Sequence, residues 1–257
     1  MTLDLHEVIA DWNAEPGEIS ARIVIGRDGG ELLQLRVDLG IMQMFPDGRP
    51  DGKRYRGLPT VLDYVEHEAR LGRHQIEDED ARELERELYQ INYRRLAFSS
   101  LVEDCLLHKN VEAAGRHVER ALHDIDGCLA RVRVIAQRCG RPAGNALRPT
   151  LTFHRGRLRV QMAILEDCYE DAVDEAQRGR QSLEELLEEL GFDEEQRNED
   201  PGVIFLRNLA QRLRREYGIT MTLNERLEAA VAEEDFALAA RLREELRKRA
   251  AARPPCK

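Results

Sequence analysis

Cysteine and histidine side chains are the first candidates for chemistry in this chain. Cys105 and His108 are one helical turn apart and could share a helix face. A zinc site needs three or four ligands of this kind, and no further cysteine or histidine is clearly aligned with this pair. The spacing therefore favours a packed cysteine beside a surface histidine, and we predict no metal site.

Phosphate binding and nucleophilic catalysis are equally weakly supported. The segment from Gly26 to Gly30 is rich in glycine, but it lacks the Lys-Ser/Thr ending and the following helix that cradle a phosphate. The sequence contains no nucleophile elbow. We therefore predict that the protein is not an enzyme, with no catalytic residue and no cofactor.

A block of arginines is the strongest electrostatic feature. Between Asp126 and Glu166 no acidic residue occurs, whereas the segment 166–200 is strongly acidic. The eight arginines of the block are Arg131, Arg133, Arg138, Arg141, Arg148, Arg155, Arg157 and Arg159. Such blocks can bind phosphate or steer a partner, or they can pair with each other across two helices. The candidate nucleic-acid contacts are Arg155, Arg157 and Arg159. Because the net charge is -10, we favour internal pairing and expect no direct contact with nucleic acid.

The N-terminal region contains the only β pattern. Alternating apolar residues over 19–25 and 33–37 flank a glycine-rich turn, which predicts a β-hairpin. Because two strands are unstable alone, residues 39–45 are expected to continue the sheet. Paired Pro and Gly residues over 46–52 predict a loop.

Helical patterns occupy most of the remaining chain, so we predict a mainly α fold with a small N-terminal β element. The expected helices cover residues 60–71, 78–107, 111–122, 125–137, 151–180, 182–190 and 203–217. Ser182 and Glu185 have the spacing of a capping box, and Gly191 is a good helix stop. The expected divisions are a β-containing region (1–58), a helical domain (59–220), a C-terminal hairpin (221–250) and a tail (251–257).

Two short segments resemble each other internally. Residues 110–114 and 168–172 share a turn, then Glu, then a small residue, and residues 235–239 are a looser version. The first two resemble the tight turn of tetratricopeptide hairpins, although the characteristic Trp and Pro positions are not filled. A generic helical bundle uses similar turn residues and stays open as the alternative.

The most specific segment is the last helical hairpin, residues 222–249. Thr222 and Glu225 have the spacing of a capping box. An apolar stripe then recurs at helical spacing, and Asp235 is a good N-cap for a second helix. A hairpin of this size buries too little apolar area to be stable alone. It must therefore pack on its own domain, on a second copy or on another protein.

This hairpin resembles the UVR motif of the excision-repair subunits UvrB and UvrC. The residues that carry the resemblance are Leu223, Leu227, Ala230, Val231, Glu234, Asp235, Phe236, Ala239, Ala240, Leu242 and Arg243. The resemblance implies a hairpin that docks on a like hairpin of a partner, with Phe236 as the anchor at the turn. The implied partner-binding residues are Leu227, Val231, Glu234, Phe236, Ala239, Leu242 and Arg243. The nuclease and ATP-binding motifs of those repair proteins are absent.

These observations lead to one functional expectation and one alternative. We expect a cytoplasmic, non-enzymatic adaptor that binds another protein, or a second copy, through the hairpin. The five cysteines show no disulfide framework, and no apolar stretch approaches the length of a membrane span. The alternative is a DNA-repair factor that contacts nucleic acid through the arginines from Arg131 to Arg159.

Overall fold

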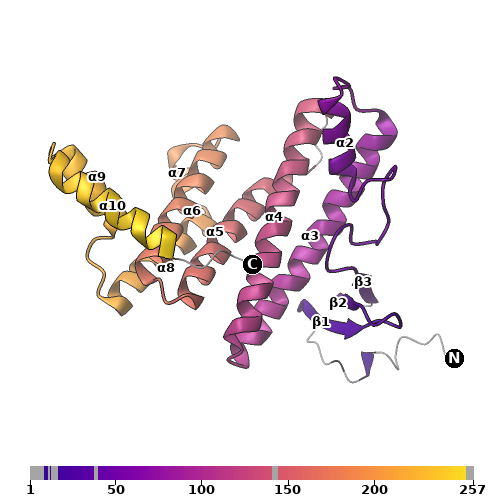
Figure 1. Cartoon of the computed structure of the whole chain (residues 1–257), viewed down its shortest axis with the longest axis horizontal. Helices are drawn as coiled ribbons and strands as arrows, with labels where there is room; N and C mark the ends of the chain where they lie inside the picture. Colours follow the sequence, from indigo (N-terminus) through magenta and orange to yellow (C-terminus); the bar gives the residue numbers. More distant parts are fainter. Residues whose placement is uncertain (1–8, 11, 13–16, 38–39, 141–143, 253–257) are drawn as a thin grey trace. The chain divides into compact units, whose positions relative to one another are not determined.

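The computed structural model describes residues 9–10, 12, 17–37, 40–140 and 144–252, with side chains described up to residue 249. It contains two compact units, residues 1–158 and residues 159–257. The boundary lies inside helix α5 (Arg148–Leu165), whereas the sequence-based divisions lie at residues 58, 220 and 250. The fold is mainly α with a small N-terminal β element, as the sequence predicts (Figure 1).

The first unit begins with an antiparallel sheet. Its strands are β1 (Ser20–Ile25), β2 (Glu31–Val37) and β3 (Gly40–Met44), in the order β1-β2-β3. The predicted hairpin and the predicted third strand are therefore both confirmed. Leu33 and Leu35, two positions apart on β2, point to one face and are fully buried. This face of the sheet packs against helix α3 (Figure 1).

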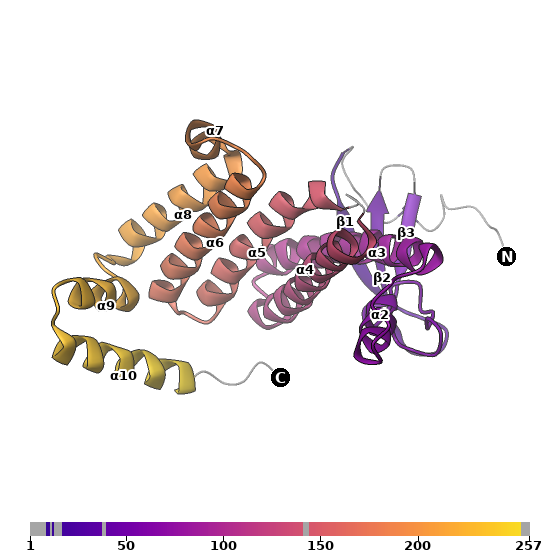
Figure 2. The same ribbon diagram turned by 90° about the horizontal axis from the view of Figure 1, so that it is seen from above.

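Two long helices form the body of the first unit. Helix α3 (Asp78–Leu107) and helix α4 (Val111–Cys139) lie side by side as an antiparallel pair, and α2 (Val61–Arg70) packs on α3 (Figures 1 and 2). Each of the two long helices is nearly as long as a complete tetratricopeptide repeat, in which two helices share 34 residues. The expected division between residues 122 and 125 is wrong, because α4 continues through this stretch. Asp124 lies there on the buried face, where it binds an arginine of α3.

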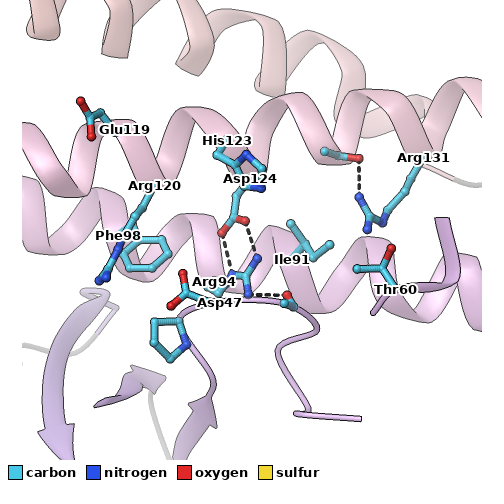
Figure 3. A pocket seen from close by; sticks show the side chains of 13 residues that line it. Asp47, Thr60, Ile91, Arg94, Phe98, Glu119, Arg120, His123, Asp124 and Arg131 are labelled. Carbon is cyan, nitrogen blue, oxygen red and sulfur yellow. Dashed lines mark hydrogen bonds and ion pairs between the residues drawn. The ribbon is translucent and has the colours of Figure 1, made fainter. Parts of the chain in front are cut away.

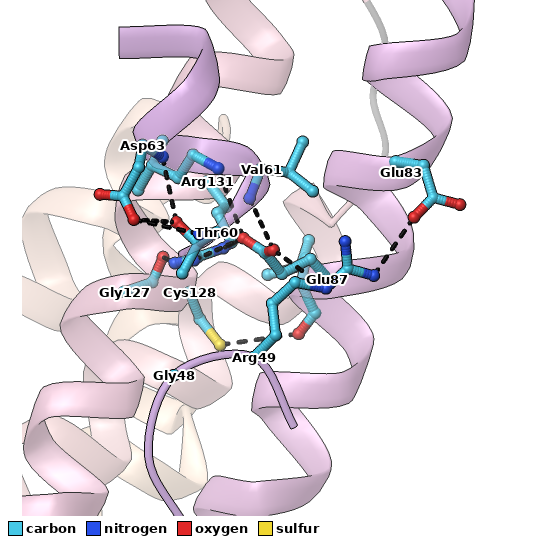
Figure 4. A network of polar contacts seen from close by, with 12 residues as sticks. Gly48, Arg49, Thr60, Val61, Asp63, Glu83, Glu87, Gly127, Cys128 and Arg131 are labelled. Carbon is cyan, nitrogen blue, oxygen red and sulfur yellow. Dashed lines mark hydrogen bonds and ion pairs between the residues drawn. The ribbon is translucent and has the colours of Figure 1, made fainter. Parts of the chain in front are cut away.

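The polar centre of the first unit is the side chain of Glu87, which is fully buried (Figure 4). One carboxylate oxygen accepts hydrogen bonds from Arg131 Nε and Nη2, at 2.8 and 2.6 Å. The other accepts from the backbone N–H of Val61 at 2.8 Å, which caps the start of α2. Arg49 Nε lies 3.6 Å from the same oxygen. One carboxylate therefore joins α2, α3, α4 and the loop that contains Arg49.

A second buried ion pair fixes the loop after the sheet. Arg94 donates from Nε and Nη2 to both oxygens of Asp124, at 2.9 and 2.6 Å. Its Nη1 donates to the carbonyls of Gly48 and Phe45, at 2.7 and 3.2 Å. Burial raises the pKa of Asp124, and the hydrogen bonds from Arg94 oppose this only in part. The pair thus holds the loop against the α3–α4 hairpin at the cost of desolvating two charges.

The second unit is helical throughout its described part. It contains the end of α5, α6 (Tyr169–Glu189), α7 (Glu194–Glu199), α8 (Pro201–Tyr217), α9 (Leu223–Ala232) and α10 (Phe236–Ala252). Helices α6 and α8 pack through small residues, including Ala172, Ala176 and Ala210, which let the backbones approach closely. The rings of Tyr169 and Tyr217 stack with centroids 3.6 Å apart.

Two helix boundaries in this unit differ from the prediction. The expected helix over 151–180 is interrupted at residues 166–168, where α5 ends and α6 begins. The expected capping box at Ser182 is wrong, because Ser182 lies within α6. Helix α6 ends at Glu189, and Gly191 follows with a φ of 88°, a left-handed conformation that glycine adopts without strain.

Glu87→Gln should lower the free energy of unfolding by about 3–5 kcal/mol, because it leaves the buried Arg131 without its carboxylate. The matched control is Glu83→Gln. Glu83 contacts Arg49 at 3.2 Å, but its side chain is 29% exposed, so its loss should cost about 1 kcal/mol or less. Urea unfolding of both variants measures the difference. Equal losses would contradict the central role of Glu87.

Two adjacent arginines offer a second test. Arg95 is buried like Arg94, but its nearest acceptor is the amide oxygen of Asn92, and its Nη1 has no hydrogen-bond partner among the described residues. Burial lowers the pKa of Arg95. Arg95→Met should therefore leave stability within about 1 kcal/mol of wild type or raise it, whereas Arg94→Met should lower it by about 3–5 kcal/mol. Thermal unfolding of the two variants distinguishes these outcomes, and a large loss in Arg95→Met would contradict the assignment.

Candidate functional site

The C-terminal hairpin forms as its capping residues predict. Thr222 Oγ1 accepts from the N–H of Glu225 at 3.2 Å, and Glu225 Oε2 accepts from the N–H of Thr222 at 2.9 Å. Asp235 Oδ1 accepts from the N–H of Leu238 at 2.9 Å, so Asp235 caps α10. The predicted capping box of α9 and the predicted N-cap of α10 are both confirmed.

The turn between α9 and α10 has a non-glycine residue in the left-handed conformation, and two other helix-to-helix turns among the described residues share this feature. Glu234 has a φ of 57°, and Lys109 and Asp167 occupy the same conformation between α3 and α4 and between α5 and α6. At each turn the next residue donates its N–H to a carbonyl five positions earlier: Asn110 to Cys105, Cys168 to Ala163 and Asp235 to Ala230. The internal similarity in the sequence therefore reflects a shared helix-ending turn.

The inner face of the hairpin is a small apolar cluster of its own. Leu223 and Ala230 of α9 are buried against Ala239 and Leu242 of α10, with Leu227 and Leu246 partly buried beside them. Alanine at two of the four buried positions lets the helices approach closely. Ala239 and Leu242, and in part Leu227, thus lie inside the hairpin rather than on its outer surface.

The other expected contact residues lie on the outside. Phe236 is 68% exposed and Val231 is 42% exposed. Glu234 and Arg243 are exposed as well. Leu238, which the sequence reasoning missed, is 38% exposed. Its position two residues after Phe236 would have placed it near the turn. The three exposed apolar residues Val231, Phe236 and Leu238 are called the hairpin tip below.

Polar contacts fasten the hairpin to the rest of its unit. Glu225 accepts hydrogen bonds from Arg214 of α8 and from Gln177 of α6. Asn224 Nδ2 donates to Asp174 Oδ2 of α6. Near the other end of the hairpin, Arg249 Nη1 donates to Glu170 at 2.8 Å. These contacts are largely electrostatic, whereas the apolar cluster of the hairpin contains only residues of α9 and α10.

The predicted basic block does not form one free surface. Arg131 is buried against Glu87, and Arg138 donates to the backbone carbonyls of His74 and Val65. Arg155 forms an ion pair with Asp126 at 2.9 Å, and Arg157 forms one with Glu103 at 2.8 Å. Arg159 is half-buried and lies in the second unit. Arg141 lies outside the described residues.

Neither a metal cluster nor a membrane span is found in the described part of the chain. No group of three or more His, Cys, Asp or Glu side chains there could hold a metal ion. Cys105 is half-buried, and His108 Nδ1 lies 2.9 Å from the carbonyl oxygen of Asp104. Among the described helices, none is both long and apolar enough to cross a membrane.

Comparison of the chain with protein-family models, with curated proteins and with solved structures finds no match.

Glu225→Gln should loosen the hairpin. Partial burial alone would raise the pKa of Glu225, but hydrogen bonds from Gln177, the Thr222 N–H and Arg214 lower it below 4.5. A carboxylate whose pKa is lower in the folded state than in the unfolded state stabilises the fold fully at a pH above the unfolded-state pKa. This stabilisation is lost as the pH falls through the folded-state pKa. We expect Glu225→Gln to cost about 1–2 kcal/mol at pH 7, and the cost should shrink as the pH falls below 4.5.

Urea unfolding at a series of pH values, with hydrogen exchange of residues 222–249 at pH 7, measures both effects. Glu228→Gln is the matched control, because Glu228 is an exposed acid of the same helix. A loss of stability that is the same at every pH, or equal in the two variants, would contradict the role given to Glu225.

Proposed function

We propose that this protein is a non-enzymatic adaptor that binds another protein through the hairpin tip. The observation that carries the proposal is the exposure of Phe236. Phe236 is 68% exposed, although the hairpin completes its own apolar cluster without it. Burying a large aromatic side chain at an interface is among the most favourable contacts that a small surface can make.

The arrangement around Phe236 supports a protein partner. Val231 and Leu238 lie within five residues of it, at the end of α9 and the start of α10. Exposed apolar side chains grouped with charged neighbours are typical of protein interfaces. Glu234 at the turn and Arg243, two helical turns along α10 from Phe236, carry opposite charges and would fix the orientation of a bound helix.

The resemblance to the UVR motif suggests the kind of partner. The residues that carry it are divided between the buried cluster (Leu223, Ala230, Ala239 and Leu242) and the exposed tip (Val231 and Phe236). We propose that the tip docks on a similar helical hairpin of a different protein. Ala239, Leu242 and Leu227 would act indirectly, by holding the two helices at the spacing that presents Phe236.

We also propose a cytoplasmic location. Cys105, Cys128 and Cys168 are free thiols, which fits a reducing compartment. Burial raises the pKa of Cys128 to about 12, so this thiol stays protonated and unreactive. The alternative of direct nucleic-acid binding has less support, because Arg155 and Arg157 already pair with carboxylates.

Phe236→Ala should weaken partner binding while leaving helicity unchanged. Truncating an interface anchor typically costs at least about 2 kcal/mol, or roughly thirtyfold in affinity. The full chain would be used to capture proteins from its native cytosol, and the affinity of each captured protein would then be measured for wild type and variant. Phe192→Ala is the matched control, since Phe192 is 44% exposed outside the hairpin.

Three outcomes decide the proposal. A captured protein that carries a helical hairpin and loses about thirtyfold in affinity for Phe236→Ala alone supports it. Equal binding by wild type and Phe236→Ala contradicts it. If sedimentation shows a dimer of wild type but none of Phe236→Ala, the hairpin tip binds a second copy of this chain. That outcome would overturn the adaptor role.

A further inference from the structure

Helix α10 has positive charges that nothing in its surroundings neutralises. An arginine of the first unit shows the contrast. Arg94 lines a pocket between the loop after β3 and the helices α3 and α4, and it is bonded to both oxygens of Asp124 (Figure 3). On α10, three exposed bases form no hydrogen bond or ion pair with any residue that the structure describes: Arg241, Arg243 and Lys248.

The basic character of α10 is only partly explained by the helix itself. The helix contains five Lys or Arg side chains and two Glu side chains, whereas the whole chain has a net charge of -10. The negative end of a helix dipole favours bases in the last turn, which accounts for Arg249. It does not account for Arg241 and Arg243, because both lie in the first half of this 17-residue helix.

One of these two arginines shares a row of side chains with Phe236. Four exposed residues recur at i, i+4, i+7 and i+11 along one side of the helix: Phe236, Ala240, Arg243 and Arg247. This row is called the Phe236 stripe below. Arg243 stands about 10 Å from Phe236 along the helix axis. Arg247 lies 3.0 Å from Glu244, but its side chain is 79% exposed, so this pair leaves most of its charge accessible.

The acids of the turn argue against a uniformly negative ligand. Glu233, Glu234 and Asp235 directly precede Phe236, and all three are exposed. A nucleic acid or an anionic bilayer would attract the bases of α10, but it would repel these carboxylates beside the aromatic ring that has to make the apolar contact. A folded protein can place an apolar group and opposite charges at separate positions. The order of acid, aromatic and base along the hairpin therefore favours a protein surface.

We propose that the partner segment that docks on the Phe236 stripe is an acidic helix. A helix laid along α10 spaces its own residues by the same rise of about 1.5 Å. If one of its apolar side chains covers Phe236, acids seven and eleven positions away meet Arg243 and Arg247. This inference rests on the proposed adaptor role, and it adds the chemistry of the partner to it.

The test uses the full chain and two synthetic helices as probes. Both probes are alanine-based peptides with one leucine, and they differ only at the seventh and eleventh positions after it, which are glutamate in one peptide and lysine in the other. Fluorescence anisotropy at low salt should show about tenfold tighter binding of the glutamate peptide. Added salt should reduce this preference, because it screens exposed charge pairs. Phe236→Ala should weaken the binding of the glutamate peptide, which would place the peptide on the stripe.

Arg243→Glu is the decisive variant, and Arg241→Glu is its matched control. Both arginines are exposed residues of the same helix, and both substitutions change the net charge equally. Arg241 is five residues from Phe236, so it points about 140° away from the stripe around the helix axis. Arg243→Glu should weaken binding of the glutamate peptide about tenfold, whereas Arg241→Glu should change it by about twofold or less. Circular dichroism checks that both variants keep their helicity.

Several results would overturn the proposal. Equal weakening by the two variants would show a general attraction of α10 for acids. Equal binding of the two peptides, or binding of neither, would remove the acidic helix as the partner. Binding of phosphatidylglycerol vesicles or of a DNA duplex that depends on Arg243, without binding of the glutamate peptide, would assign the stripe to a membrane or to nucleic acid. The capture experiment with Phe236→Ala is independent of these probes, so the adaptor role can stand when the acidic helix fails.

Discussion

The buried carboxylate of Glu87 is the interaction on which the first unit depends. It receives two hydrogen bonds from Arg131 of α4 and one from the first N–H of α2, while Arg49 of the loop approaches the same group. Four segments far apart in the sequence therefore share one negative charge. A buried charge is tolerated only when its partners stay in place, so this contact fixes the register of α3 on α4 and the start of α2 together.

Charges perform a different task in the second unit. Glu225 has a side chain that is 25% exposed, and its partner Arg214 is 22% exposed. Breaking a contact of this kind destabilises the fold less than removing one partner of a fully buried pair, and salt screens the contact more strongly. The first unit thus uses buried charges to hold its loop and helices rigidly. The second unit uses partly exposed charges to fasten a hairpin whose apolar cluster is self-contained. The loop of the first unit is therefore held by buried charges, and the hairpin of the second unit by partly exposed ones.

The three similar turns show how a local sequence pattern can indicate geometry without indicating a repeat. Lys109, Asp167 and Glu234 all have positive φ values near 57°, and each stands two residues before the first residue of the next helix. The helices they join differ greatly in length, from the 10 residues of α9 to the 30 residues of α3. Local backbone chemistry fixes the turn, whereas the packing partners of each helix fix its length.

The sequence by itself determined the features that depend on neighbouring residues. The β-hairpin and its third strand, the caps at Thr222 and Asp235, and the bounds of α3 all follow from residues within a few positions of each other. The exposure of Phe236 could be expected only through a resemblance. Only the tertiary structure decided which charges are paired. Glu87 and Arg131 are 44 positions apart, and Arg94 and Asp124 are 30 apart. The continuity of α4 through Asp124 depends on such a long-range contact. No spacing rule along the chain can specify these contacts, because they form only when the helices pack.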